Sequence, residues 1–176
     1  MSDNHWQTLP LDQTGYAAWL RDHGSLTQRI QRRCTQFGVR NVRSCLAPAA
    51  HDETALLGLP PQQKIYTREV FLYADGHPVV FAHSVTAAHH LHGAWHTLPN
   101  LGNRPLGALL FAHPLVRRAP LHYRALRPRH PLYRHAVVEL DTRPCKLWAR
   151  RSLFTLHDAP LLVTELFLPD ILKLAK

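Results

Sequence analysis

Residues 66–85 read YTREVFLYADGHPVVFAHSV and carry the clearest secondary-structure signal of the chain. The ADG segment at residues 74–76 is typical of a tight turn, and apolar and β-branched side chains, which are typical of strands, dominate on both sides of it. The stretch therefore predicts a β-hairpin. Residues 148–168 predict a second hairpin for the same reason, with its turn at residues 157–159.

Helices are predicted on either side of the first hairpin. Between residues 12 and 37, apolar side chains recur at helical spacing and Gly24 interrupts them, which indicates two helices joined by a tight turn. Ser25, followed three residues later by Gln28, resembles a capping box at the start of the second helix. Residues 89–110 predict a second helical pair.

The other segments give weaker signals. Residues 39–47 are typical of a short strand, residues 48–61 of a loop that contains Pro and Ala, and residues 121–140 of a basic strand broken by two prolines. Asn103 and Pro105 resemble a helix start, with an Asn cap and a Pro in the first turn. Together the elements predict the α+β class, with one antiparallel sheet of hairpins beneath two helix-turn-helix segments.

The composition is that of a globular protein, with 45% hydrophobic and 19% charged residues, and 176 residues fit a single domain, 1–176. Residues 1–9 lack the features of a signal peptide, and about 18 uninterrupted apolar residues occur nowhere. We therefore expect a cytoplasmic protein without stable membrane insertion. The three cysteines show no C-x-x-C spacing, which fits a reducing compartment. The formal net charge of +9 attracts anions but does not distinguish nucleic acid, acidic lipid and anionic metabolites.

Glu165 is a candidate catalytic residue. It lies in the apolar stretch LLVTELFL at residues 161–168, where strand alternation places it on one face with Val163 and Phe167. A carboxylate in such a place is expected to have an ion-pair or hydrogen-bond partner or a functional role, because isolated burial of a charge costs several kcal/mol. The alternative is a glutamate at a sheet edge or in a structural ion pair.

Arg68 shares a strand face with Val70 and Leu72, which is unusual for a side chain that keeps its charge. A buried guanidinium is suited to bind a planar carboxylate through two parallel hydrogen bonds. The alternative pairs Arg68 with a structural carboxylate, either Glu69 or Glu165.

Leu106 follows Pro105 at the predicted helix start, where free backbone N–H groups favour a polar or anionic oxygen. Its side chain would only shape a wall of a site. The alternative is an ordinary helix start packed on the core.

Two other patterns point to functions that we do not predict. His89, His90, His92 and His96 lie close together, and the last two would share a helical face, but no H-E-x-x-H motif accompanies them, so no metal site is expected. The basic stretch at residues 117–134, with interleaved tyrosines, is compatible with single-stranded nucleic acid. It is more often a solvated strand face, and no nucleic-acid-binding module matches it.

Four segments, taken in order, resemble the chorismate pyruvate-lyase family. They are REVFLYADG at residues 68–76, PLG at residues 105–107 ahead of Leu110 and Phe111, LWARRS at residues 147–152, and PLLVTELFLP at residues 160–169. The resemblance spans most of the chain from about Ser25 onward.

The resemblance implies a single antiparallel sheet with helices on one side and two helix-turn-helix flaps that close an internal ligand cavity. It implies that Arg68 and Glu165 are catalytic and that they line the ligand site with Leu26 and the main chain at Leu106. The implied activity is that of a carbon–oxygen lyase, which cuts chorismate into pyruvate and 4-hydroxybenzoate, the ring precursor of ubiquinone. No cofactor, metal or nucleic acid is implied, and a monomer subject to product inhibition is expected.

The sequence departs from the family pattern in two places. His83 stands where members often carry Arg, which puts a second cation in the site in doubt, and residues 120–146 form a longer stretch than in the shortest members. The same fold resembles the effector-binding domains of some bacterial transcription regulators. A non-catalytic binding domain is therefore the alternative, although we expect no room here for the winged helix of those regulators.

Overall fold

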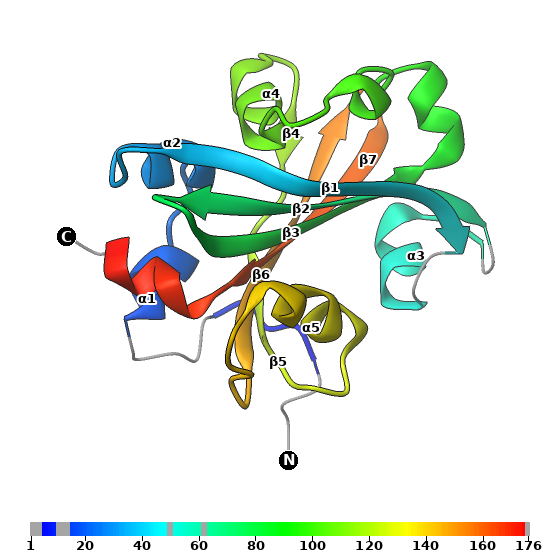
Figure 1. The fold of residues 1–176 in the computed structure, drawn as a ribbon. Coiled ribbons are helices and arrows are strands. Elements are labelled where there is room, and N and C mark those ends of the chain that lie inside the picture. The colour runs from blue at the N-terminus through cyan, green and yellow to red at the C-terminus, as the bar shows by residue number, and fades with distance from the viewer. Residues whose placement is uncertain (1–4, 10–14, 49–50, 61–62, 175–176) are drawn as a thin grey trace.

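A seven-stranded antiparallel sheet forms the centre of the fold in the computed structural model, which describes residues 5–9, 15–48, 51–60 and 63–174. The strand order is β1-β2-β3-β7-β6-β4, and β5 also pairs with β6 (Figure 1). The strands are β1 (Phe37–Pro48), β2 (Lys64–Ala74), β3 (His77–Ala87), β4 (Arg117–Arg118), β5 (His122–Leu126), β6 (Leu147–Leu156) and β7 (Ala159–Phe167). The predicted α+β class with a single antiparallel sheet is confirmed.

Both predicted hairpins are present, and they lie side by side because β3 pairs with β7. Each turn uses two residues with positive φ: Asp75 (48°) and Gly76 (85°) in the first, and His157 (48°) and Asp158 (61°) in the second. Two consecutive positive φ values match the right-handed twist of the flanking strands. The turns therefore help to set the register between the strands. In this register Arg68 lies opposite Ser84.

The first predicted helical pair is confirmed as α1 (Tyr16–Leu20) and α2 (Leu26–Gln31). The Ser25 hydroxyl caps α2 by accepting a 3.3 Å hydrogen bond from the N–H of Gln28. The second pair differs from the prediction, because it consists of two 3₁₀ helices, η1 (Ala88–His92) and η2 (Leu98–Asn100), followed by α4 (Leu106–Ala112). Pro105, not Asn103, occupies the N-cap position of α4.

Two other predictions are wrong, because helices form where a loop and a strand were expected. The helix α3 (His51–Leu57) lies in the predicted loop, and Asp52 and Glu53 favour its start by lying in the first turn, near the positive end of the helix dipole. The predicted strand 121–140 contains β5 and then α5 (Pro131–Ala136), followed by η3 (Val137–Glu139). Pro131 occupies the first turn of α5, where its missing N–H costs nothing, and the His130 ring caps the helix.

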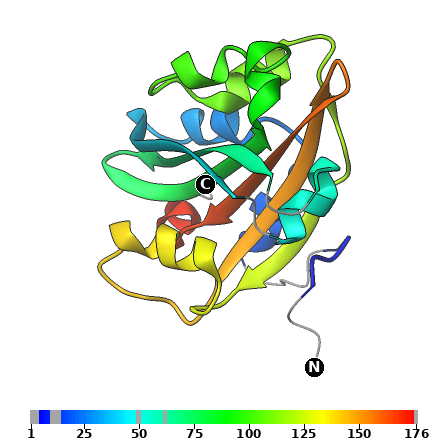
Figure 2. The same cartoon turned by 90° about the vertical axis from the view of Figure 1, so that its right-hand side faces the viewer.

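Helices cover both faces of the sheet, whereas the sequence predicted them on one side. The helices α1, α2 and α4 cover one face, together with the C-terminal 3₁₀ helix η4 (Pro169–Leu174) beside α1. The helices α3 and α5 cover the other face, so in both views the sheet separates α4 from α5 (Figure 1, Figure 2).

Each face of the sheet carries two apolar clusters with polar residues between them. Under α1 and α2 the first cluster contains Trp19, Val70 and Phe167, and under α4 the second contains Leu106 and Val163. Arg68 and Glu165 lie in their strands between these two groups. The face under α3 and α5 repeats the arrangement with other residues. The middle of each face is therefore where the sheet holds buried charge.

Among the described residues, no helix has the length and apolar composition needed to cross a bilayer.

Candidate active site

A cavity lies on the sheet face covered by α1, α2 and α4. Alternate residues of β2, β3, β7 and β6 form its floor, and the first residues of α2 and α4 contribute its roof. The four residues that the sequence associated with a ligand site all line this cavity: Leu26, Arg68, Leu106 and Glu165. The structure therefore brings these four residues together around one cavity.

Arg68 is buried, with 2% of its surface exposed. Its Nη2 donates to the carbonyl oxygens of Gly102 (2.9 Å) and Arg104 (3.1 Å), and burial lowers the pKa of its guanidinium. An arginine nevertheless stays charged at neutral pH. Among the described residues it forms no ion pair with Glu69, Glu165 or any other carboxylate, so the alternative of a structural ion pair is wrong. No carboxylate of the described residues therefore neutralises the charge of Arg68.

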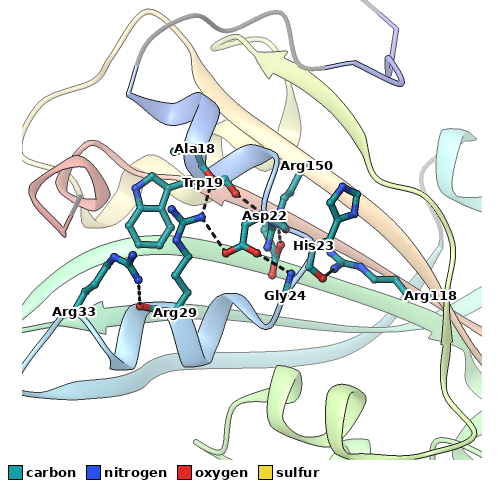
Figure 3. Close-up of polar contacts among 10 residues, drawn as sticks. Ala18, Trp19, Asp22, His23, Gly24, Arg29, Arg33, Arg118 and Arg150 are labelled. Carbon is teal, nitrogen blue, oxygen red and sulfur yellow. Dashed lines mark hydrogen bonds and ion pairs between the residues drawn. The ribbon is translucent and has the colours of Figure 1, made fainter. Parts of the chain in front are cut away.

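Glu165 is paired with Arg150, which lies directly opposite on β6. Arg150 is fully buried, and its Nε donates to Oε2 of Glu165 at 2.6 Å. Its Nη1 donates to the carbonyl oxygens of Trp19 (3.1 Å) and Asp22 (2.5 Å) (Figure 3). Glu165 therefore does have an ion-pair partner, as the structural alternative proposed, but it also lines the cavity. Its other carboxylate oxygen, Oε1, has no partner within the part of the chain that the structure describes.

Arg118 is a third arginine of the cavity. Its Nη1 donates to the carbonyl oxygen of His23 at 2.9 Å, and its guanidinium lies 5.5 Å from the ring centre of Phe111 and 5.3 Å from that of Phe154. Burial lowers the pKa of Arg118, and the nearby charge of Glu165 opposes this shift. Arg118 and Arg150 together hold the turn between α1 and α2 against the sheet (Figure 3).

These two arginines are not among the site residues predicted from the sequence. Strand alternation does contain a signal for Arg150, because consecutive strand residues lie on opposite faces and one of the pair Arg150-Arg151 therefore has to face the cavity. Arg151 does lie on the other face, where its Nη1 donates to Asp52 at 2.9 Å. For Arg118, the sequence predicts a place in a solvated basic strand. No periodicity identified it, because β4 has only two residues.

The roof of the cavity is a close contact between the two flaps. Thr27 of α2 packs on Gly107 of α4, and a Cβ atom at position 107 would lie 2.9 Å from Oγ1 of Thr27. Glycine is therefore required there by space rather than by φ. The enclosed volume is about 40 Å³, far less than the roughly 300–1,000 Å³ of small-molecule sites. The arrangement of α2 and α4 in this structure therefore leaves less room than such sites usually have.

A second hollow, of about 440 Å³, lies on the opposite face of the sheet between β1, α3 and α5. His83 is buried there, with Nδ1 2.9 Å from Glu69 and Nε2 2.9 Å from Glu53. Burial alone would lower the pKa of His83, but the two carboxylates raise it to about 9. His83 is thus a cation that donates from both ring nitrogens. It does not face the candidate active site, so its replacement of Arg removes no cation from that site.

The histidines at residues 89–96 form no metal cluster. Within the described ranges, no three His, Cys, Asp or Glu side chains are placed to hold a metal ion.

Comparison with known proteins identifies the family of this chain. The family model for chorismate lyase matches residues 5–176. A probable chorismate pyruvate-lyase of Nitrosospira multiformis is 52% identical over 158 residues, which cover 89% of this chain and 88% of the relative. One of Nitrosomonas europaea is 49% identical over 156 residues, with the same coverage of both chains.

Solved structures with a similar fold include transcription regulators and the effector domain of one of them. The effector domain of PhnF from Mycobacterium smegmatis superposes with a TM-score of 0.61 at 16% identity, covering 84% of this chain and 90% of that one. A GntR-family regulator from Bacillus cereus has a TM-score of 0.56 at 11% identity, covering 77% and 94%. Likeness at this level of identity concerns the fold alone. The family model and the identity of about 50% to its members over most of the sequence show that this chain belongs to the chorismate lyase family.

Proposed function

We propose that the protein is a chorismate pyruvate-lyase, which eliminates pyruvate from chorismate to give 4-hydroxybenzoate for ubiquinone synthesis. The observation that carries the proposal is the buried guanidinium of Arg68, which has no carboxylate partner among the described residues and lines the same cavity as Glu165. In a member of this family, that arrangement supports binding of an anionic ring between the sheet and the two flaps.

Chorismate carries a ring carboxylate, a 4-hydroxyl group and a 3-enolpyruvyl ether. We propose that Arg68 binds the ring carboxylate through its remaining N–H groups, with the roof residues Leu26 and Leu106 enclosing the ring. Two parallel charge-assisted hydrogen bonds fix the orientation of a planar carboxylate as well as its position. Holding the ring in one orientation accounts for part of the rate acceleration.

The elimination removes the hydrogen at C4 and breaks the bond between C3 and the ether oxygen. The ring becomes aromatic, which makes the reaction strongly downhill without a metal or redox cofactor. We propose that Glu165 acts on the 4-hydroxyl end of the substrate, because Arg150 holds its Oε2 and no described residue binds its Oε1. Two routes stay open for the C4 proton: Glu165 takes it as a base, or the enolpyruvyl group takes it internally.

The product keeps both the carboxylate and the hydroxyl group by which the substrate is bound. We therefore propose that 4-hydroxybenzoate inhibits competitively and that opening of α2 and α4 limits its release. Lid opening is often the slow step where the chemistry is easy. We also propose that the chain acts as a monomeric single domain in the cytoplasm, with chorismate and 4-hydroxybenzoate as its small-molecule ligands and no nucleic acid partner.

The direct test is to incubate the purified protein with chorismate. The ultraviolet spectrum should show 4-hydroxybenzoate, and lactate dehydrogenase with NADH should report an equal amount of pyruvate. Binding of 4-hydroxybenzoate with no turnover would contradict the proposal and favour a non-catalytic effector-binding domain. Rapid mixing with excess chorismate should give a burst of about one product per site if release is limiting.

A further inference from the structure

The positive charge that lines the cavity is larger than the charge that would neutralise one carboxylate. Its charged lining residues are Arg68, Arg118, Arg150 and Glu165, which give a formal charge of +2. Arg150 and Glu165 neutralise each other, so the surplus lies on Arg68 and Arg118. Chorismate carries two carboxylates, one on the ring and one on the enolpyruvyl group, whereas 4-hydroxybenzoate carries only one.

Arg118 has donor capacity that its protein contacts do not use. One nitrogen, Nη1, donates to His23, but Nε is buried and has no hydrogen-bond partner among the described residues. Leaving such a donor unpaired is unfavourable, and more so when the group is charged. The rings of Phe111 and Phe154 restrict where the guanidinium can move. The side chain is therefore already positioned for an additional acceptor.

Arg118 and Arg68 reach the cavity from opposite sides. Arg68 lies on β2, whereas Arg118 lies on β4 opposite Phe154 of β6, so that β3, β7 and β6 separate the two strands. Figure 3 shows the Arg118 side chain extending over the sheet toward the turn at His23, near Arg150. Two cations at opposite ends of one enclosed cavity fit a ligand with an anionic group at each end.

We propose that Arg118 binds the enolpyruvyl carboxylate of chorismate and so distinguishes the dicarboxylate substrate from the monocarboxylate product. This inference rests on the proposed lyase function. It assigns different tasks to the two arginines: Arg68 holds the carboxylate that substrate and product share, and Arg118 holds the one that leaves with pyruvate. Loss of pyruvate then removes the partner of Arg118 while the ring remains bound to Arg68.

The experiment compares kcat/KM for chorismate with the inhibition constant of 4-hydroxybenzoate in Arg118→Ala, with Arg117→Ala as the matched control. Arg117 precedes Arg118 on the same short strand but is exposed and does not line the cavity. A charge-assisted hydrogen bond is worth about 1.5–3 kcal/mol, so kcat/KM should fall roughly 10- to 100-fold in Arg118→Ala. The inhibition constant of 4-hydroxybenzoate should change by less than about threefold, and Arg117→Ala should resemble the wild type.

The result that would overturn the inference is a parallel loss, in which Arg118→Ala weakens product inhibition as much as it lowers kcat/KM, or an unchanged kcat/KM. A purely structural role in holding the turn at His23 predicts such a parallel loss. If Arg118→Ala does not fold, Arg118→Lys gives the same test, because lysine keeps the charge but loses the planar fork. Failure of the wild-type protein to convert chorismate would overturn the lyase proposal itself, and this outcome is separate from any difference between the variants.

Discussion

The two faces of the sheet bury similar numbers of charged side chains but compensate them differently. Under α3 and α5, the cation His83 lies between Glu69 and Glu53, and His135 adds a second hydrogen bond to Glu69. Under α2 and α4, the partners that the described residues offer are fewer: Arg150 pairs with Glu165, and two carbonyl oxygens accept from Arg68. On the first face, the charge of the buried cation is compensated by carboxylates of the protein. On the second face, positive charge remains without a carboxylate partner among the described residues.

This difference shows that burial of charge alone does not identify a site. Glu69 is as buried as many core residues, and burial alone would raise its pKa, yet hydrogen bonds from His83 and His135 outweigh burial and lower it. Its charge is used within the protein. The useful signal on the other face is a buried cation whose partners are neutral, because a carbonyl oxygen leaves the full charge to attract an anion.

The largest effect should come from Glu165→Gln, which removes the charge while preserving shape and a hydrogen-bond acceptor for Arg150. As an acid or base, Glu165 should contribute about 10²- to 10⁴-fold to kcat. Steady-state kinetics with chorismate measures the loss, and binding of 4-hydroxybenzoate shows that the cavity is intact. Full activity would exclude the acid/base role but would leave a hydrogen-bonding role possible.

Arg68→Ala should reduce both catalysis and product binding, because it removes the cation that both ligands share. The expected cost is about 2–4 kcal/mol in transition-state stabilisation. The measurements are kcat/KM for chorismate and the dissociation constant of 4-hydroxybenzoate. A folded variant with near-normal values for both would show that Arg68, like His83, has a structural role and does not bind the ligand.

On the opposite face, His83→Gln should reduce stability and leave catalysis nearly unchanged. Because the folded pKa of His83 is raised from 6.5 to about 9, its stabilising effect is fully present below about pH 6.5 and is lost as the pH rises through about 9. The wild-type free energy of unfolding should therefore fall between pH 6.5 and 9 by an amount on the order of 2–3 kcal/mol.

Urea unfolding of the wild type and His83→Gln at several pH values checks this expectation. The difference between the two proteins should shrink as the pH rises, since other titrating groups contribute equally to both. A large loss of kcat/KM in a folded His83→Gln protein would mean that the two faces are coupled rather than independent.

A smaller effect is expected from Gly107→Ala, which places a methyl group against Oγ1 of Thr27 between the flaps. Overpacking of this kind costs roughly 1–3 kcal/mol. The contact between α2 and α4 should be destabilised, so that 4-hydroxybenzoate inhibits about fivefold or more weakly. The double variant with Thr27→Ala removes the clash and should recover most of the loss relative to Thr27→Ala alone. No recovery would show that the flaps do not close through this contact.

The smallest effect concerns long-range charge. The formal net charge of +9 should speed capture of a dianion, so kcat/KM should fall a few-fold between low and physiological salt. Stopped assays at fixed pH across a salt series measure it. If kcat/KM does not change with salt, the surface charge has another use, and nucleic-acid binding is the next property to test.

The sequence by itself determined the two hairpins and which residues share a face. Strand alternation placed Arg68 with Val70 and Glu165 with Val163, because the side-chain period of a strand is independent of its neighbours. The resemblance to the family then connected residues almost a hundred positions apart, Arg68 and Glu165, to one site. In the structure, both residues line the same cavity.

Only the tertiary structure decided which charges compensate one another. Arg118 lines the cavity from a two-residue strand. Glu53 contacts His83 from α3, a helix in a segment predicted to be a loop. Neither contact corresponds to a periodic pattern in the sequence, since each depends on how a distant segment packs on the sheet. Compensation of a buried charge depends on distances of a few ångströms between elements, and local sequence patterns do not encode those distances.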